Sequence, residues 1–246
     1  MLIQNGSGDS LPSHPIRHKT TPYRSPASEG NSYGSMPTVS AVVVAGGKSE
    51  RLGQDKSLIR LGNERLLKRV ISTLQGLSDD VLLAANDRDK FQDLSVRVVP
   101  DLWPQAGPLG GIHSGLRSMR YERGIFVACD MPFLNPALLR YMILLSPGFD
   151  VVIPRIGCNV EPLHAIYSKA CAQPIADLLE QHGRRVVGFL TDVRVRYVHE
   201  AEINAFDPEH ISFFNINTTQ DLAEARRLLK ISKESARGKR PKVKLH

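Results

Sequence analysis

The sequence is poor in the features that mark secreted, membrane or zinc-cluster proteins. Only three of its 246 residues are cysteines, and they are widely spaced with no C-x-x-C pair. Their odd number and wide spacing argue against a disulfide framework or a zinc site and predict a cytoplasmic protein in a reducing compartment. No apolar run approaches the roughly 20 residues that span a bilayer, so no membrane association is expected.

Aromatic residues are also scarce, at 6%, and the net charge of +7 is concentrated at the ends of the chain. Residues 230–246 carry seven Lys or Arg against one acid, whereas residues 39–229 carry 22 basic and 22 acidic residues. A neutral body with few aromatics is not expected to bind nucleic acid specifically. A short basic tail can attract any polyanion, but it is typical of a solvated chain end.

Composition divides the chain into three parts. Residues 1–38 are rich in Ser, Pro and Gly and lack the apolar segment of a secretory signal, which predicts a disordered extension with Met36 as an alternative start. Residues 39–229 form the predicted domain, and residues 230–246 the predicted disordered basic tail.

Strand and helix patterns alternate throughout residues 39–229. This alternation predicts an α/β fold of the Rossmann-like, doubly wound type, with a mostly parallel sheet and helices on both faces. Such sheets bind ligands at the carboxyl ends of their strands, so polar residues directly after strands are the candidates for a site. Strands are expected at 39–45, 80–85, 96–99, 124–129, 149–153, 163–167, 193–198 and 213–216, and helices at 64–77, 108–119, 136–145, 169–182 and 218–229.

The first such candidate is a glycine-rich segment, VVVAGGKSERLGQDKS, at residues 42–57. A P-loop would need a glycine where Val42 stands and a helix beginning at Lys48, but Gly53 and Asp55 disfavour that helix. The dinucleotide pattern G-x-G-x-x-G does not fit either. The strand GIFVACD does imitate the magnesium-binding strand of P-loop enzymes, so that alternative stays open.

The segment fits better as a longer phosphate loop, A-G-G-x-S-x-R-x-G-x-D-K, from Ala45 to Lys56. Gly46 and Gly47 would let backbone N–H groups turn toward a triphosphate. Arg51 and Lys56 would then add positive charge where pyrophosphate leaves. The alternative interpretation is a glycine-rich turn with solvated charges.

Two acidic residues also follow predicted strands. Asp130 follows GIFVAC and precedes Met-Pro, and its carboxylate is either a hard oxygen ligand for Mg²⁺ or a turn aspartate before proline. Asp101 precedes a segment in which Gly107, Gly110 and Gly111 let a flat base approach the backbone. The helix expected to begin at Pro108 offers free N–H groups beside it.

Together these motifs resemble those of the molybdenum cofactor guanylyltransferases, in the molybdopterin nucleotidyltransferase family. The resemblance covers residues 40–229 and implies a sheet of the nucleotide-diphospho-sugar transferase type. It implies that GMP passes from GTP to molybdenum-molybdopterin with release of pyrophosphate, with Mg²⁺ as cofactor held by Asp130 in the C-D-x-P signature. Arg51, Lys56 and Asp130 are the implied catalytic residues. The implied GTP-binding residues are Val44, Ala45, Gly46, Gly47, Lys56, Asn86, Asp101 and Asp130.

The resemblance also points to an acceptor side. Asn215 and Asn217, in an N-x-N-T pattern, are expected two residues apart on one face of a strand, and Arg184 follows a glycine where it could meet an acidic acceptor. The resemblance implies that the segment EPLHAIYS faces this side, although His164 within it is interpreted as an ordinary hydrogen-bonded histidine. Trp103, the single tryptophan, either covers a base or packs its loop.

The chain departs from the plainest family pattern at two positions, with Val44 in place of leucine and Gly110 in place of alanine. Neither change removes a functional group. Alternatives to guanylyl transfer are a related cytidylyltransferase, a sugar-phosphate nucleotidyltransferase and a nucleotide-binding partner without catalysis. The resemblance also suggests molybdoenzyme-maturation proteins as partners.

Overall fold

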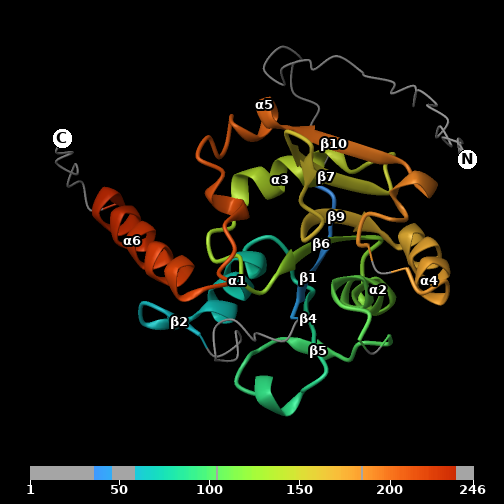
Figure 1. Cartoon of the computed structure of the whole chain (residues 1–246), viewed down its shortest axis with the longest axis horizontal. Helices are drawn as coiled ribbons and strands as arrows, with labels where there is room; N and C mark the ends of the chain where they lie inside the picture. The colour runs from blue at the N-terminus through green and yellow to red at the C-terminus, as the bar shows by residue number, and fades with distance from the viewer. Residues whose placement is uncertain (1–35, 46–58, 104, 184, 237–246) are drawn as a thin grey trace, which may run out of the picture. The chain divides into compact units, whose positions relative to one another are not determined.

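An eight-stranded sheet forms the centre of the protein (Figure 1). The computed structural model describes residues 36–45, 59–103, 105–183 and 185–236. The strands lie in the order β10-β7-β9-β6-β1-β4-β5, and β8 pairs with β7. Their bounds are β1 (Ser40–Val44), β4 (Val81–Ala84), β5 (Arg97–Val99), β6 (Arg123–Ala128), β7 (Val151–Ile156), β8 (Asn159–Val160), β9 (His164–Ser168) and β10 (Val195–His199).

The sheet is mostly parallel, as expected from the alternation of strands and helices. Strands β5, β4, β1 and β6 run parallel to one another, whereas β9 runs antiparallel to both β6 and β7. The chain adds β4 and β5 on one side of β1 and then β6 on the other. The carboxyl ends of β1 and β6 therefore border the switch point, which is where open α/β sheets bind ligands.

Helices cover both faces of the sheet. Figure 1 shows α1 and α3 on one face and α2 and α4 on the other, and the apolar side chains divide accordingly into two cores. Strand β1 contributes side chains to both cores, because Ala41 and Val43 face the α1 side and Val42 and Val44 face the α2 side. The helices are α1 (Leu66–Gln75), α2 (Pro108–Ser118), α3 (Pro136–Leu145), α4 (Ala172–Glu180), α5 (Glu200–Ile203) and α6 (Thr219–Ala236).

Helix α2 lies unusually close to the sheet because glycines face it. A Cβ atom at Gly111 would lie 2.6 Å from Val44 Cγ1, and one at Gly115 would lie 2.7 Å from both Phe126 and Val42. Pro108 begins the helix as predicted, after Gly107 with a φ of 66°. This close contact fixes the amino end of α2 beside the carboxyl ends of β1 and β5.

The predicted strand at 213–216 is wrong. Residues Ile211–Phe213 form a short 3-10 turn, η6, and residues 214–217 join no described strand. The apolar side chains of this segment contact two separate clusters, since Phe213 packs on the α1–α3 core and Phe214 and Ile216 pack under α6. Phe214 and Ile216 are two residues apart on one cluster, so the period-two pattern arises from an extended segment that pairs with no described strand.

The carboxyl-terminal helix α6 begins as predicted. The Thr218 hydroxyl accepts a hydrogen bond from the Asp221 N–H (3.1 Å), and the Asp221 carboxylate accepts one from the Thr218 N–H (2.8 Å). The helix continues to Ala236, beyond the expected end at residue 229. None of the helices among the described residues is long and apolar enough to cross a membrane.

Candidate functional site

Four strand ends meet along one edge of the sheet. Backbone hydrogen bonds join Cys129 N–H to the Val44 carbonyl (3.2 Å), Ala45 N–H to the Ala84 carbonyl (3.0 Å) and Ala85 N–H to the Val99 carbonyl (2.9 Å). The predicted residues that follow these strands therefore lie in a row: Asp130, Ala45, Asn86 and Asp101. With strands about 4.8 Å apart, Asp130 and Asp101 are roughly 14 Å apart along this edge. Such a spacing suits the two ends of one nucleotide and is too long for two ligands of one metal ion.

Asp130 lies in a turn that is held at several points. Its carbonyl accepts a hydrogen bond from Ile216 N–H (3.0 Å), and the Arg69 Nε donates to the Pro132 carbonyl (2.8 Å). Asn135 then caps α3 by accepting hydrogen bonds from two of its backbone N–H groups. The Asp130 side chain is half-buried at the rim, so its carboxylate has a defined place beside the switch point.

Asp101 and Asn86 form one unit. The Asn86 Oδ1 accepts a hydrogen bond from Asp101 N–H (2.8 Å), and the Asp101 Oδ1 accepts one from Trp103 N–H (2.9 Å). The Ser114 Oγ accepts from Leu102 N–H (2.8 Å) and donates to Asp101 Oδ1 over 3.4 Å. The exposed Asn86 therefore orders the Asp101 loop, and a direct contact of Asn86 with a nucleotide stays a prediction.

The Asp101 carboxylate lies directly on the amino-terminal turn of α2. A Cβ atom at Gly110 would lie 2.7 and 2.9 Å from its two oxygens, so glycine at this position permits the contact. A carboxylate acceptor and the free N–H groups of a helix terminus are thereby brought side by side. Gly110 was expected to let a base approach the backbone, whereas its contact with the Asp101 carboxylate and the role of Ser114 were not predicted.

The predicted phosphate loop lies largely outside the described residues. Gly46, Gly47, Arg51 and Lys56 fall in that part, and Arg184 does as well. The chain leaves β1 through Ala45 and is described again from Ile59, whose carbonyl accepts a hydrogen bond from Leu66 N–H (2.8 Å). The hairpin of β2 (Arg60–Leu61) and β3 (Glu64–Arg65) leads from there into α1.

Asn215 and Asn217 are not on a strand, which corrects the predicted geometry. The Asn215 Nδ2 donates to the Phe213 carbonyl (3.1 Å), and Asn217 is exposed just before α6. Their segment nevertheless lies against the Asp130 turn through the hydrogen bond from Ile216 N–H. Their role in binding an acceptor stays a prediction.

His164 is fully buried, and the predicted hydrogen bond to its ring is not confirmed. Its side chain is 0% exposed, its ring packs against Phe213 at 4.7 Å between centroids, and neither nitrogen has a hydrogen-bond partner among the described residues. Burial lowers its pKa to about 4, although Asp207 and the Ser212 backbone act in the opposite direction. Burial also raises the pKa of Glu161, which lies shortly before β9 at the same edge.

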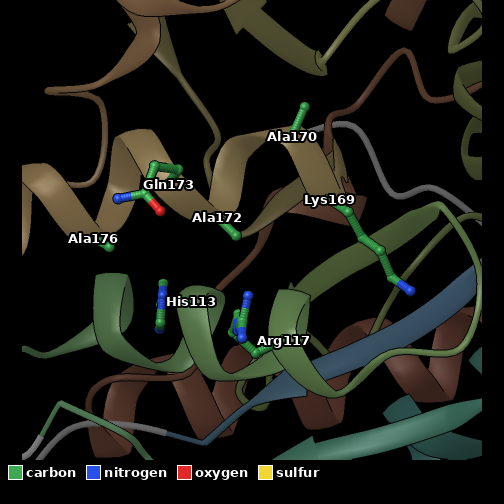
Figure 2. A pocket seen from close by; sticks show the side chains of 7 residues that line it. All are labelled: His113, Arg117, Lys169, Ala170, Ala172, Gln173 and Ala176. Carbon is green, nitrogen blue, oxygen red and sulfur yellow. The ribbon is translucent and has the colours of Figure 1, made fainter.

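A pocket of about 470 Å³ lies elsewhere, between α2 and α4 (Figure 2). Figure 2 shows His113 and Arg117 of α2 facing Gln173 and Ala176 of α4, with Lys169 beyond them. None of the predicted site residues that the structure describes lines this pocket. Its Gln173 amide is held by Asp177 (2.7 Å) and the Lys169 ammonium by the Arg120 carbonyl (3.2 Å). The row of strand ends, where the predicted residues gather, is the better candidate for catalysis.

The donor set around Asp130 suits a magnesium ion bound together with a nucleotide. No group of three or more His, Cys, Asp or Glu side chains that could hold a metal occurs within the described part of the chain. Magnesium in phosphate-transfer sites is usually held by one or two carboxylates, with substrate phosphates and water completing its ligands. A single half-buried carboxylate at the switch point fits this arrangement.

Comparison with known proteins agrees with the geometry. The family model of the MobA-like NTP transferase domain matches residues 41–195. A protein of Pelotomaculum thermopropionicum named "Probable molybdenum cofactor guanylyltransferase" is 41% identical over 191 residues, covering 78% of this chain and 93% of its own length. The molybdenum cofactor guanylyltransferase of Desulfosudis oleivorans is 34% identical over 203 residues, covering 81% of this chain and 100% of its own.

A solved structure is also similar. The crystal structure of molybdopterin-guanine dinucleotide biosynthesis protein A from Archaeoglobus fulgidus superimposes with a TM-score of 0.69 at 28% identity, covering 78% of this chain and 99% of that one. Nucleotidyltransferases of this kind typically require a divalent metal ion. On its sequence, its sheet and its relatives, the chain belongs to the MobA-like NTP transferase family of nucleotidyltransferases.

Proposed function

We propose that this protein transfers GMP from GTP to the terminal phosphate of molybdenum-molybdopterin and releases pyrophosphate. The observation that carries the proposal is the row of strand ends, in which the Asp130 turn and the Asp101–α2 unit border one edge of the sheet. The relatives named as molybdenum cofactor guanylyltransferases support the choice of substrates. The product would be the molybdopterin guanine dinucleotide cofactor.

In this proposal, each end of the edge binds a different part of the nucleotide. Guanine presents an exocyclic N–H₂ donor, and the Asp101 carboxylate is an acceptor that lies at the α2 terminus. The N–H groups at the start of α2 would face the same ligand. The Asp101 loop, ordered by Asn86 and Ser114, would therefore hold the nucleoside, which leaves the triphosphate to extend past the carboxyl end of β1 toward Asp130.

The chemistry is a phosphoryl-group displacement that needs positioning and charge neutralisation more than covalent help. An oxygen of the acceptor phosphate bonds to the α-phosphorus of GTP while the bond from that phosphorus to pyrophosphate breaks. The acceptor phosphate is already ionised near neutral pH, so no general base is required. Asp130 would hold a Mg²⁺ ion, which when bound neutralises charge on the phosphates. Arg51 and Lys56 would stabilise the departing pyrophosphate.

Asn215, Asn217 and Arg184 are proposed to contact the acceptor. The first two lie in the segment against the Asp130 turn, which is the side on which an attacking phosphate would need to arrive. A cytoplasmic location is proposed as well, because the three cysteines, all of which the structure describes, form no disulfide. A molybdoenzyme-maturation protein as recipient of the product stays a prediction.

The direct test is pyrophosphate release with molybdenum-molybdopterin, Mg²⁺ and each of the four nucleoside triphosphates in turn. Of the four nucleotides, only GTP is expected to support pyrophosphate release. Release with CTP and not with GTP would overturn the assignment of the base. Asp130→Ala should lose turnover while its thermal unfolding stays close to that of the wild type. Asp79→Ala is the matched control, because Asp79 is an exposed acid that pairs with Arg120. An Asp130→Ala enzyme that kept near-full rate would remove Asp130 from the mechanism.

A further inference from the structure

We propose that Arg69 is a positioning residue, which holds the Asp130 turn in the conformation that binds the metal ion of the nucleotide. The inference rests on the proposed function, since it takes Asp130 as the metal-binding carboxylate. Arg69 does not touch the reacting atoms in this account. It acts on the backbone two residues beyond Asp130, and its contribution should appear in the metal requirement of the enzyme.

The contacts of Arg69 are specific. Its Nε donates a hydrogen bond to the Pro132 carbonyl over 2.8 Å, and its guanidinium carbon lies 5.7 Å from the centroid of the Phe133 ring. The helix that carries it is anchored on both sides of this position, because Leu66 and Val70 are both 1% exposed or less. The guanidinium therefore contacts the turn from a well-anchored helix, although Arg69 and Pro132 are 63 residues apart in the sequence.

The same turn is also held by a second segment. Ile216 N–H donates to the Asp130 carbonyl (3.0 Å), and the Phe214 ring lies 6.2 Å from the Phe133 ring. Ile216 is itself buried beneath α6, so this support is also rigid. The backbone from Asp130 to Phe133 is therefore held by both α1 and the segment that precedes α6.

Removing one of the two supports should loosen the turn without unfolding the protein. Pro132 cannot donate a backbone hydrogen bond, so its carbonyl is the group through which the turn can be held at that residue. Metal ligands must be kept within about 0.5 Å of the productive geometry, and loss of a group that orients a ligand typically costs about 10–100-fold in metal affinity or activity. Because Arg69 acts on the backbone and not on the carboxylate, a loss of metal affinity of about 10-fold is expected.

The test compares three variants with the wild type. Arg69→Met keeps the apolar stem and removes the donor, whereas Arg69→Lys keeps a charge and a donor and should fall between Arg69→Met and the wild type. Lys68→Met is the matched control, since it removes the same charge from the neighbouring, exposed position of α1. The charge of Lys68 lowers the pKa of Asp93, which lies outside the Asp130 turn. Two quantities are measured: the Mg²⁺ concentration that gives half-maximal pyrophosphate release, and the binding of Mn²⁺ in the presence of GTP, read by electron paramagnetic resonance without acceptor.

Arg69→Met is expected to raise the half-maximal Mg²⁺ concentration about 10-fold, to weaken Mn²⁺ binding by a similar factor, and to recover most of its rate at high Mg²⁺. A merely structural role would lower the rate equally at every Mg²⁺ concentration. Metal titrations of Arg69→Met that match those of Lys68→Met would overturn the inference.

The two proposals fail in different ways. Unchanged Mn²⁺ binding in Asp130→Ala would contradict the proposed function, and the role of Arg69 would be lost with it. Loss of Mn²⁺ binding in Asp130→Ala together with normal binding in Arg69→Met would contradict only the positioning role.

Discussion

The buried His164 makes the stability of this protein sensitive to mild acid in a way that can be calculated. Its ring is enclosed with Phe213 at 4.7 Å between centroids and has no hydrogen-bond partner among the described residues. Burial lowers the pKa of His164 from 6.5 to about 4, because the charged imidazolium would lose its solvent. Asp207, which is buried nearby, favours the charged form but does not offset the loss.

The sign and the size follow from proton linkage. Between pH 6.5 and about 4 the unfolded chain binds a proton at His164 that the folded protein does not, so the free energy of unfolding falls as the pH falls. Each pKa unit is worth about 1.4 kcal/mol, which gives about 3 kcal/mol for the full difference and about 2 kcal/mol between pH 7 and pH 5. This stability is present above pH 6.5 and is largely lost at pH 4.

The assay is urea unfolding of the wild type and of His164→Leu at pH 7, 6 and 5. Leucine removes the titrating group and keeps an apolar side chain in an apolar site. Between pH 7 and pH 5, the free energy of unfolding should fall by about 2 kcal/mol less in the variant than in the wild type. Other groups, such as Glu161 with its raised pKa, titrate in both proteins and cancel in the difference. Parallel pH profiles for the two proteins would refute the reasoning.

Two further substitutions test the fold and the nucleoside end of the site. Gly115→Ala should lower the free energy of unfolding by about 1–3 kcal/mol in urea titrations, because its Cβ would lie 2.7 Å from both Phe126 and Val42, and a stability equal to the wild type would show that α2 can move off the sheet. Asp101→Asn should raise the KM for GTP roughly 10-fold or more, since a hydrogen bond to a charged acceptor is worth about 1.5–3 kcal/mol. An unchanged KM, with unfolding as in the wild type, would place the base elsewhere.

Much of this architecture was predictable because local patterns and global topology agree. Strand β1 is a continuous apolar run, and it is buried on both faces as that pattern indicates. Asp101 and Asp130 follow strands that were recognisable from their apolar residues, and parallel pairing then brings their ends to one edge. The rule that ligands bind at such ends was enough to select these two acids.

The remaining errors and omissions have physical causes. In the segment 213–216, Phe214 and Ile216 alternate with Asn215 as in a strand, but no neighbouring strand pairs with them among the described residues. The contact of Arg69 with the Asp130 turn could not be predicted from sequence patterns, because its partner is a backbone carbonyl far away in the sequence. His164 was expected to be hydrogen-bonded, which is usual for a buried polar group, but its place in β9 packs the ring against Phe213.

The central claim is that a single nucleotide spans the edge of the sheet from Asp101 to Asp130. A crystal structure of the protein with GTP and Mn²⁺, with the metal located by its anomalous scattering, tests this most directly. The account predicts a metal peak beside the Asp130 carboxylate and the guanine beside Asp101 at the start of α2. A metal distant from Asp130, or a nucleotide seated in the pocket between α2 and α4, would contradict it.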